Sequence, residues 1–186
     1  MLVGIRDKTL YVIRTLGCRR SDAMKIYLDN NVVSAIAKDD TASESASLNR
    51  LLAVYDQNKV ELVTSEVTFG EIKRYVGKER ILVERTFRLL EKVAVVRWDE
   101  LLFINIYDDG RTFINSPVID NDPLYESLLK LGLEQVDAQH VFVASKQGCA
   151  VFLTCDGGVL SRVKNIRHLC GLEVEKPSEL VARMGW

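Results

Sequence analysis

The sequence has few of the features that mark secreted, zinc-binding or membrane proteins. It holds four cysteines in 186 residues, none in a C-x-x-C pair, and His168 and Cys170 have no second pair of zinc ligands nearby. No run approaches the roughly 18 apolar residues that a membrane-spanning helix requires. The first 23 residues are too interrupted for a signal peptide. We therefore expect no membrane association and a location in the reducing cytoplasm.

The sequence also has no excess of positive charge. Its 25 basic residues stand against 26 acidic ones, for a formal net charge of -1. A protein that holds nucleic acid by overall electrostatic attraction is normally strongly basic. Any nucleic acid is therefore expected to be held by a local basic patch or through metal ions. The hydrophobic content of 47% is ordinary for one globular domain.

Strand-like and helix-like segments alternate from residue 24 onward. Short apolar runs at 25–28, 60–63, 93–96, 150–153 and 172–174 predict strands. Helical patterns occur at 32–38, 48–55, 66–75, 78–92, 124–131, 136–147 and 158–163, and again from Pro177. The helix at 66–75 is expected to start at Thr64 to Glu66, which are residue types that cap helices. This alternation predicts an α/β fold, a three-layer sandwich around a parallel sheet of about five strands. Residues 98–122 fit neither pattern and are expected to form a loop-rich excursion.

Four acidic residues are predicted to meet at one edge of that sheet. Asp29 directly follows the first strand, and Asp156 comes shortly after the fourth. Asp137 stands in the first turn of the helix that leads into the fourth strand. Glu71 lies in the helix after the second strand, whose apolar face is expected to hold Phe69, Ile72 and Val76. Ligands of parallel sheets bind at the carboxyl ends of the strands, so this edge is the candidate site.

Each of these acids also has a structural explanation when it is considered alone. Asp29 is suited to cap the helix that follows it, and Asp137 to face a helix dipole. Glu71 is suited to a solvated helix face, and Asp156 to a turn before Gly157. Together, however, clustered carboxylates repel one another, and a divalent cation reverses that repulsion. Carboxylate oxygens suit Mg²⁺ or Mn²⁺, ions that can hold a phosphate oxygen and activate water.

Four short segments resemble, in order, the motifs of PIN domains. They are IYLDNNV at 26–32, TSEVTFGEI at 64–72, VDAQHV at 136–141 and FLTCD at 152–156. The similarity covers residues 24–183. It implies a PIN-like, Rossmann-like nuclease domain over residues 24–186, with residues 1–23 as an extension outside the core.

The resemblance also implies an activity and a set of residue roles. Asp29, Glu71, Asp137 and Asp156 would bind Mg²⁺ or Mn²⁺ and catalyse the cleavage of single-stranded RNA by an activated water. Thr154 would orient the cluster through its hydroxyl, and Asn31 would support Asp29. Many bacterial members are VapC-type toxins, endoribonucleases that a small antitoxin protein inhibits and that are often homodimeric. RNA, an antitoxin and a second copy are therefore the expected partners.

The sequence departs from the family pattern in ways that keep an alternative open. Gly157 and Gly158 stand where a further acid or asparagine often follows Asp156. A catalytically degenerate PIN-like module, which binds RNA or a protein partner without cleavage, is therefore the alternative function. A signalling receiver would need paired acids near the first strand. A dehalogenase-type phosphatase would need a second aspartate at position 31, which is Asn.

Basic residues near the predicted site are candidates for contacting RNA. Lys73 and Arg74 follow Glu71, and Arg162 and Lys164 follow Asp156. Such a run is more often a solvated face, since glutamates interleave with the basic residues on the helices after the second strand. The alternative is a patch that steers RNA phosphates toward the acids.

We predict that a chain shortened to begin at Met24 still folds, because the first strand and its motif lie after that residue. It should unfold cooperatively on heating, as single domains of this size usually do, in a melt followed by circular dichroism. An insoluble or unstructured product would show instead that residues 1–23 contribute to the core.

Overall fold

The computed structural model describes residues 23–38, 42–72, 74–78, 80–81, 83–84, 94–96 and 122–186. The expected extension at 1–23, apart from its last residue, lies outside the described residues. So does the excursion at 98–122, apart from its last residue, and so does Lys73.

A five-stranded sheet forms the centre of the fold. The strands are β1 (Met24–Leu28), β2 (Val60–Ser65), β3 (Ala94–Val96), β4 (Val151–Leu153) and β5 (Glu173–Glu175). Their order across the sheet is β3-β2-β1-β4-β5, and each neighbouring pair is parallel. The predicted α/β fold with a parallel sheet is confirmed. Because β1 lies between β2 and β4, the chain reverses its direction across the sheet at the β1–β4 boundary, where ligand sites of such sheets form.

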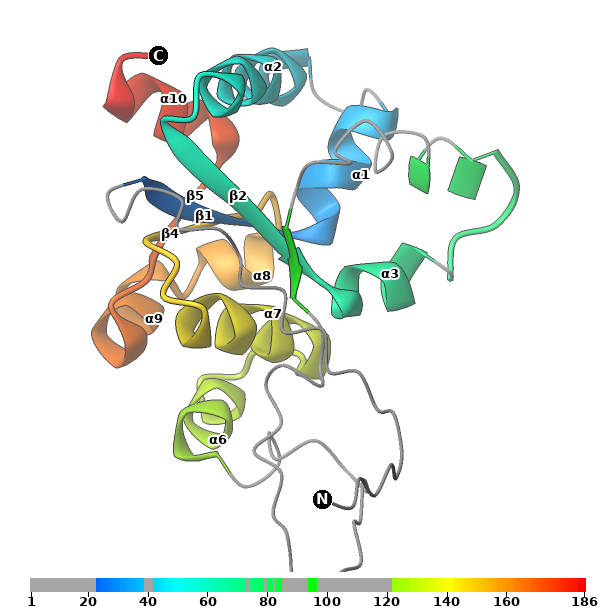
Figure 1. Cartoon of the computed structure of the whole chain (residues 1–186). Coiled ribbons are helices and arrows are strands. Elements are labelled where there is room, and N and C mark those ends of the chain that lie inside the picture. The colour runs from blue at the N-terminus through cyan, green and yellow to red at the C-terminus, as the bar shows by residue number, and fades with distance from the viewer. Residues whose placement is uncertain are drawn as a thin grey trace, which may run out of the picture.

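Helices cover both faces of the sheet (Figure 1). They are α1 (Asn30–Lys38), α2 (Ala42–Asp56), α3 (Glu66–Ile72), α6 (Pro123–Lys130), α7 (Gln135–Lys146), α8 (Gly157–Leu160), α9 (Val163–Cys170) and α10 (Pro177–Met184). None of the helices in the described ranges is long and apolar enough to cross a membrane.

The alternation of side chains along β1 separates two hydrophobic cores. Tyr27 and Phe152 point into the core that contains residues of α6, α7 and α9. Ile26 and Leu28 point to the opposite face, into the core that contains residues of α1, α2 and α10, Leu180 among them. Successive residues of a strand point to opposite faces, so strands covered on both sides are apolar at every position. That is why these short runs could be recognised in the sequence.

Several elements differ from the sequence prediction. β2 continues through Thr64 and Ser65, which were expected to start a helix, and α3 begins only at Glu66. Thr64 and Ser65 belong to the sheet because they pair with Val95 and Val96 of β3, and the Thr64 hydroxyl also donates to Leu28 O at 3.1 Å. α3 ends at Ile72, and Val76, expected on its apolar face, is 80% exposed. The helix α9 was not predicted, because Ile166 is its single fully buried residue.

A buried carboxylate joins two helices that are far apart in the sequence. Glu44 of α2 accepts hydrogen bonds from the backbone N–H of Ser178, at 3.0 Å, and from its hydroxyl, at 2.6 Å. Ser178 lies in the first turn of α10, where the N–H groups have no partner within the helix. Glu44 therefore satisfies the start of α10 and places a negative charge where the helix dipole favours it.

We predict that Glu44→Ala destabilises the protein by about 1–3 kcal/mol, because it leaves the partly buried N–H and hydroxyl of Ser178 without their acceptor. Urea unfolding would measure the loss. Glu126→Ala is the matched control, since Glu126 is exposed and lies 3.6 Å from Lys130 in a surface ion pair; its effect should stay within about 0.5 kcal/mol. Equal effects of the two substitutions would contradict this role for Glu44.

Candidate metal centre

Asp29 lies directly after β1, at the boundary where the direction of the sheet order reverses. Its backbone N–H donates to Leu153 O at 3.1 Å, so the pairing of β1 with β4 continues to this residue. Its carboxylate is buried and accepts three hydrogen bonds. Asn30 N donates to Oδ1 at 2.7 Å, while Asn31 Nδ2 and Thr154 Oγ1 donate to Oδ2 at 2.9 and 2.7 Å. This fixes the carboxylate in one orientation.

Thr154 and Asn31 tie Asp29 to the turn after β4. Asn31 Oδ1 accepts from Cys155 N at 2.8 Å, and Thr154 Oγ1 accepts from Asp156 N at 3.0 Å. The structure thus places both residues in contact with Asp29, as their assumed supporting roles require. Since Asn31 belongs to α1 and Thr154 follows β4, the carboxylate is held by elements from the two halves of the chain.

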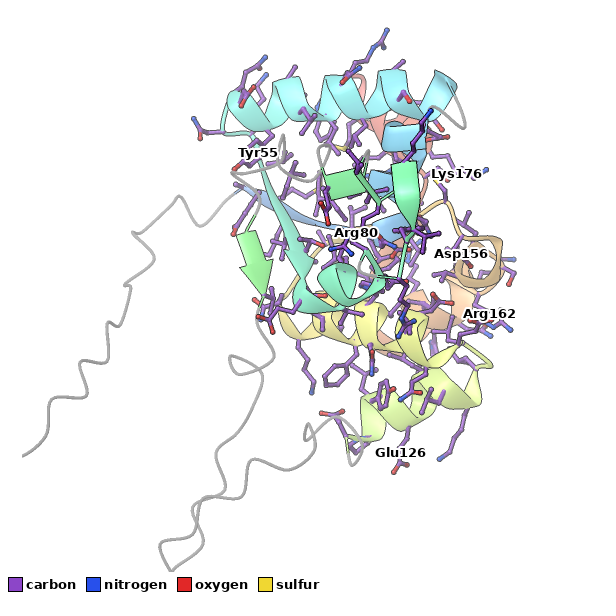
Figure 2. All side chains as sticks on the ribbon, turned by 90° about the vertical axis from the view of Figure 1, so that its right-hand side faces the viewer. Tyr55, Arg80, Glu126, Asp156, Arg162 and Lys176 are labelled. Atoms are coloured by element: carbon purple, nitrogen blue, oxygen red, sulfur yellow. The ribbon has the colours of Figure 1, made fainter. Side chains whose placement is uncertain are left out.

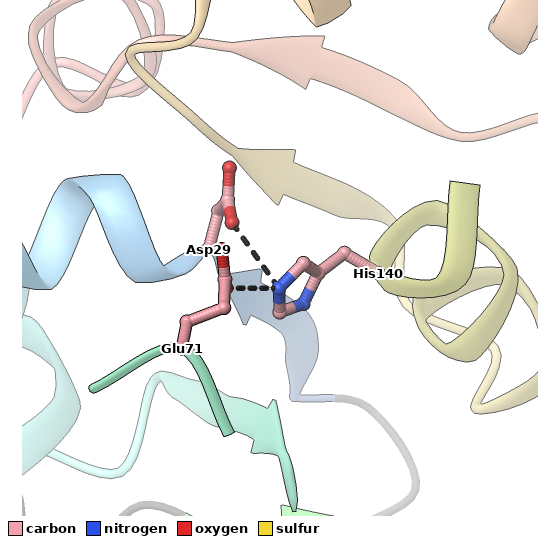
Figure 3. A group of neighbouring side chains, drawn as sticks. All are labelled: Asp29, Glu71 and His140. Carbon is pink, nitrogen blue, oxygen red and sulfur yellow. Dashed lines mark hydrogen bonds and ion pairs between the residues drawn. The ribbon is translucent and has the colours of Figure 1, made fainter. Parts of the chain in front are cut away.

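Glu71 and His140 complete the centre of the cluster (Figure 3). His140 Nε2 lies 2.7 Å from Glu71 Oε2 and 3.7 Å from Asp29 Oδ1. One potential ligand atom from each of these three residues lies within 4.8 Å of the others. Glu71 is only partly buried, so the cluster has one side open to solvent.

Sequence reasoning assigned no role to His140, although it lies in the third motif. The available signal was spacing: His140 stands three residues after Asp137 on α7, and such residues share a helix face. Spacing alone does not distinguish this position from a buried core position. The distinguishing contact is with Tyr27 of β1, whose hydroxyl lies 2.8 Å from His140 Nδ1.

Asp137 and Asp156 stand beside this group. Burial, followed by the charges of Asp156 and Asp29, raises the pKa of Asp137 to about 6. The charges of Asp156 and Asp29 thus act on Asp137, but among the described residues neither Asp137 nor Asp156 joins the group of ligand atoms formed by Asp29, Glu71 and His140. Asp156 also caps α8, because its Oδ1 accepts from Val159 N at 3.0 Å. A Cβ at Gly158 would lie 2.9 Å from that oxygen, so a larger residue there would displace the Asp156 carboxylate.

Burial and charge act in opposite directions on the central groups. Burial raises the pKa of Asp29, and the charge of Glu71 adds to the rise, against the opposing effects of His140 and Thr154. Burial alone would lower the pKa of His140. Its hydrogen bond to Glu71 and the surrounding carboxylates outweigh burial and hold that pKa above its usual value. The cluster therefore carries an excess of negative charge at low dielectric, the condition under which a bound cation stabilises ionised ligands most.

The donor set fits a divalent cation. Carboxylate oxygens from Asp29 and Glu71, with Asp137 and Asp156 nearby, are the hard ligands that Mg²⁺ and Mn²⁺ take. The imidazole nitrogen of His140 suits Mn²⁺ and other transition ions. Among the described residues, Asp29 and Glu71 supply carboxylate oxygens close enough to share one ion, with the His140 ring beside them.

The candidate RNA-binding residues differ in their surroundings. Arg74 and Lys164 are exposed. Arg162 instead donates to Leu131 O at 2.7 Å and to Gly158 O at 2.6 Å, and so joins α8 to the end of α6 (Figure 2). These bonds to backbone carbonyls give Arg162 a structural role, and its contact with RNA stays a prediction.

Comparisons with known proteins support the fold. No protein-family model and no curated protein matches the chain. Among solved structures, it is similar to a chain in the crystal structure of VapBC2 from Rickettsia felis bound to a DNA fragment from their promoter. The TM-score is 0.51 at 12% sequence identity, over 82% of this chain and 98% of that chain. At this identity the likeness concerns the fold.

We predict that Asp137→Asn stabilises the metal-free protein at pH 7, because it removes a charge that burial and two carboxylates disfavour. The pKa of Asp137 rises from 3.8 to about 6 on folding. The folded state therefore binds more protons between these values, and its stability falls as the pH rises through them. In the presence of chelator, the Tm of the Asp137→Asn protein should equal that of the wild type near pH 4. At pH 7 it should be higher by about 2–4 °C, the shift that about 1 kcal/mol produces.

Thermal melts at both pH values would measure this difference. Glu126→Gln, an exposed acid on α6, should show no such pH-dependent gain. With added Mg²⁺ or Mn²⁺ the wild type should have the higher Tm, because metal binding stabilises it more than it stabilises the variant. An Asp137→Asn protein that is less stable than the wild type at pH 7 in chelator would contradict the repulsion described here.

Proposed function

We propose that this protein is a metal-dependent endoribonuclease of the PIN kind. The observation that carries the proposal is the buried Asp29 at the β1–β4 boundary, with Glu71 and His140 within 4.8 Å and further acids beside it. Structural ion pairs rarely gather several carboxylates without matching cations, because like charges in a buried place repel. The fold similarity to a chain of VapBC2 adds support.

In this proposal Asp29, Glu71, Asp137 and Asp156 hold Mg²⁺ or Mn²⁺, which supplies charge neutralisation at the phosphate and activation of water. The chain's own contribution is orientation. Thr154 and Asn31 fix the Asp29 carboxylate through Oδ2, so that its Oδ1 faces His140 and Glu71.

The proposed reaction is hydrolysis of a phosphodiester in single-stranded RNA. A water oxygen bonds to phosphorus, the bond from phosphorus to O3′ breaks, and O3′ takes a proton. One water is consumed, and the ends are a 3′-hydroxyl and a 5′-phosphate. The ribose 2′-hydroxyl takes no part, because water supplies the attacking oxygen. Arg74 and Lys164 are the exposed basic residues proposed to attract the RNA backbone.

We further propose that the protein is the toxin of a toxin–antitoxin pair. Its motifs resemble those of VapC-type toxins, and its fold is like that of a chain from VapBC2. A small antitoxin protein and a second copy of this chain are the proposed protein partners.

A second candidate is a PIN-like module that binds RNA without cutting it. The observation that favours it is Asp156, whose carboxylate caps α8 and whose neighbours are Gly157 and Gly158 rather than acids. A carboxylate that accepts a hydrogen bond at a helix N-terminus has fewer lone pairs to offer a metal.

We predict that the purified protein cleaves a mixed single-stranded RNA pool with Mn²⁺ or Mg²⁺ and not with chelator. Asp29→Asn should lower the rate by more than about 100-fold, because even the loss of a partner that orients a ligand costs 10- to 100-fold. Thr154→Val, which removes such a partner, should fall within that smaller range. Gel electrophoresis and end analysis would measure the rates and identify 3′-hydroxyl and 5′-phosphate ends.

Glu126→Gln is the control that should keep full activity. An RNA with 2′-deoxyribose at the cleaved position should still be cut. Activity that survives chelator or Asp29→Asn, or ends that carry a cyclic phosphate, would exclude this mechanism. RNA binding without any cleavage would favour the non-cutting module.

A further inference from the structure

His140 brings a nitrogen atom into a cluster that otherwise offers only carboxylate oxygens. The ring comes from α7, and its edge faces both Glu71 and Asp29 (Figure 3), at 2.7 and 3.7 Å from Nε2. Two atoms bound to one ion at about 2.0–2.2 Å each lie no more than about 4.4 Å apart. Both separations fall inside this limit, so Nε2 can reach an ion that Asp29 and Glu71 hold.

The other ring nitrogen, Nδ1, is hydrogen-bonded to a chain of two buried hydroxyls. Tyr27 OH lies 2.8 Å from His140 Nδ1 and 2.6 Å from Ser65 Oγ. A neutral imidazole with its hydrogen on Nδ1 donates to Tyr27, whose own hydrogen goes to Ser65. Without a cation, Nε2–H donates to Glu71 Oε2 at 2.7 Å. When a cation takes the place of that hydrogen, the bond from Nδ1 to Tyr27 keeps the lone pair of Nε2 directed at the carboxylates. Histidines that bind metals almost always have their second nitrogen anchored by such a partner.

Packing prevents the ring from turning away. His140 is 1% exposed, and its ring meets Tyr27 edge-on at 5.8 Å between centroids. Tyr27 in turn stacks on Phe152 at 5.3 Å with the planes 7° apart. The direction of Nε2 is therefore set by β1 and β4, the same strands that position Asp29.

We propose that His140 Nε2 is a ligand of the cation held by Asp29 and Glu71, and that the centre consequently prefers Mn²⁺ to Mg²⁺. The inference rests on the proposed function for the presence of a cation, and it adds a ligand and a selectivity. Mg²⁺ favours oxygen ligands and keeps much of its water, whereas imidazole suits transition ions. A purely carboxylate centre would lack this source of selectivity.

The experiment measures metal binding on the full chain, without RNA. Loss of the electron paramagnetic resonance signal of free Mn²⁺ gives the Mn²⁺ affinity, and competition by Mg²⁺ gives the ratio of the two. His140→Gln should lower the Mn²⁺ affinity by about 10- to 100-fold and the Mg²⁺ affinity by less than about 3-fold. His168→Gln is the matched control, because His168 is exposed on α9 and is the chain's other histidine; both affinities should stay unchanged.

A second measurement keeps the inference testable if the His140→Gln protein fails to fold. Electron spin echo modulation of Mn²⁺ bound to the wild type should show coupling to a directly bound ¹⁴N nucleus. The coupling should persist in His168→Gln and vanish in a folded His140→Gln protein. Equal losses of both affinities would overturn the inference and leave His140 a residue that only positions Glu71. A wild-type spectrum without nitrogen coupling would overturn it as well.

These outcomes separate the inference from the proposed function. Nitrogen coupling in a protein that cleaves no RNA would overturn the nuclease and leave the metal ligand standing. Metal-dependent cleavage without nitrogen coupling would overturn only the ligand. A protein that binds neither ion would overturn both.

Discussion

A carboxylate buried at the end of the central strand is the constraint on which this structure depends. Removing a charged group from water is costly unless hydrogen bonds and opposite charge replace the water. Asp29 receives three donors, from the backbone of Asn30 and the side chains of Asn31 and Thr154. The turn after β4, the start of α1 and the orientation of α7 all serve this requirement. The same arrangement leaves more negative than positive charge at the sheet edge.

The parts of the fold that could be predicted are those marked by a regular pattern of apolar residues along the chain. Strands buried on both faces are continuous apolar runs, so β1 and β4 were evident, and with them the positions of Asp29 and Asp156 at one edge. The parallel sheet followed from the alternation of elements. Thr64 and Ser65 were assigned to a helix start because both residue types favour caps. The pairing of Thr64 and Ser65 with β3 and the bond from Thr64 to Leu28 O decide for the strand.

Features that depend on contacts between distant segments could not be predicted. His140 is a lone histidine on a mostly buried helix, and only the approach of Tyr27, 113 positions earlier, distinguishes it. The charge of Arg162, on which its predicted RNA contact rests, is visible in the sequence, whereas its bonds to Leu131 O and Gly158 O are not. From the sequence alone, Gly158 is notable only because it stands where the family pattern often has a further acid or asparagine. In the structure it makes room for the Asp156 carboxylate that caps α8.

The sequence distance between the parts of the centre has a consequence for synthesis of the protein. Asp29 and Thr154 are 125 positions apart, and β1 gains its second neighbour only when β4 pairs with it. Contacts of such long range form late, because the chain between them must first be ordered. A growing chain carries Asp29 and Glu71 long before Thr154 has been added. The acidic site at the end of β1 therefore stays incomplete until β4 has joined the sheet, whatever part of the chain has folded by then.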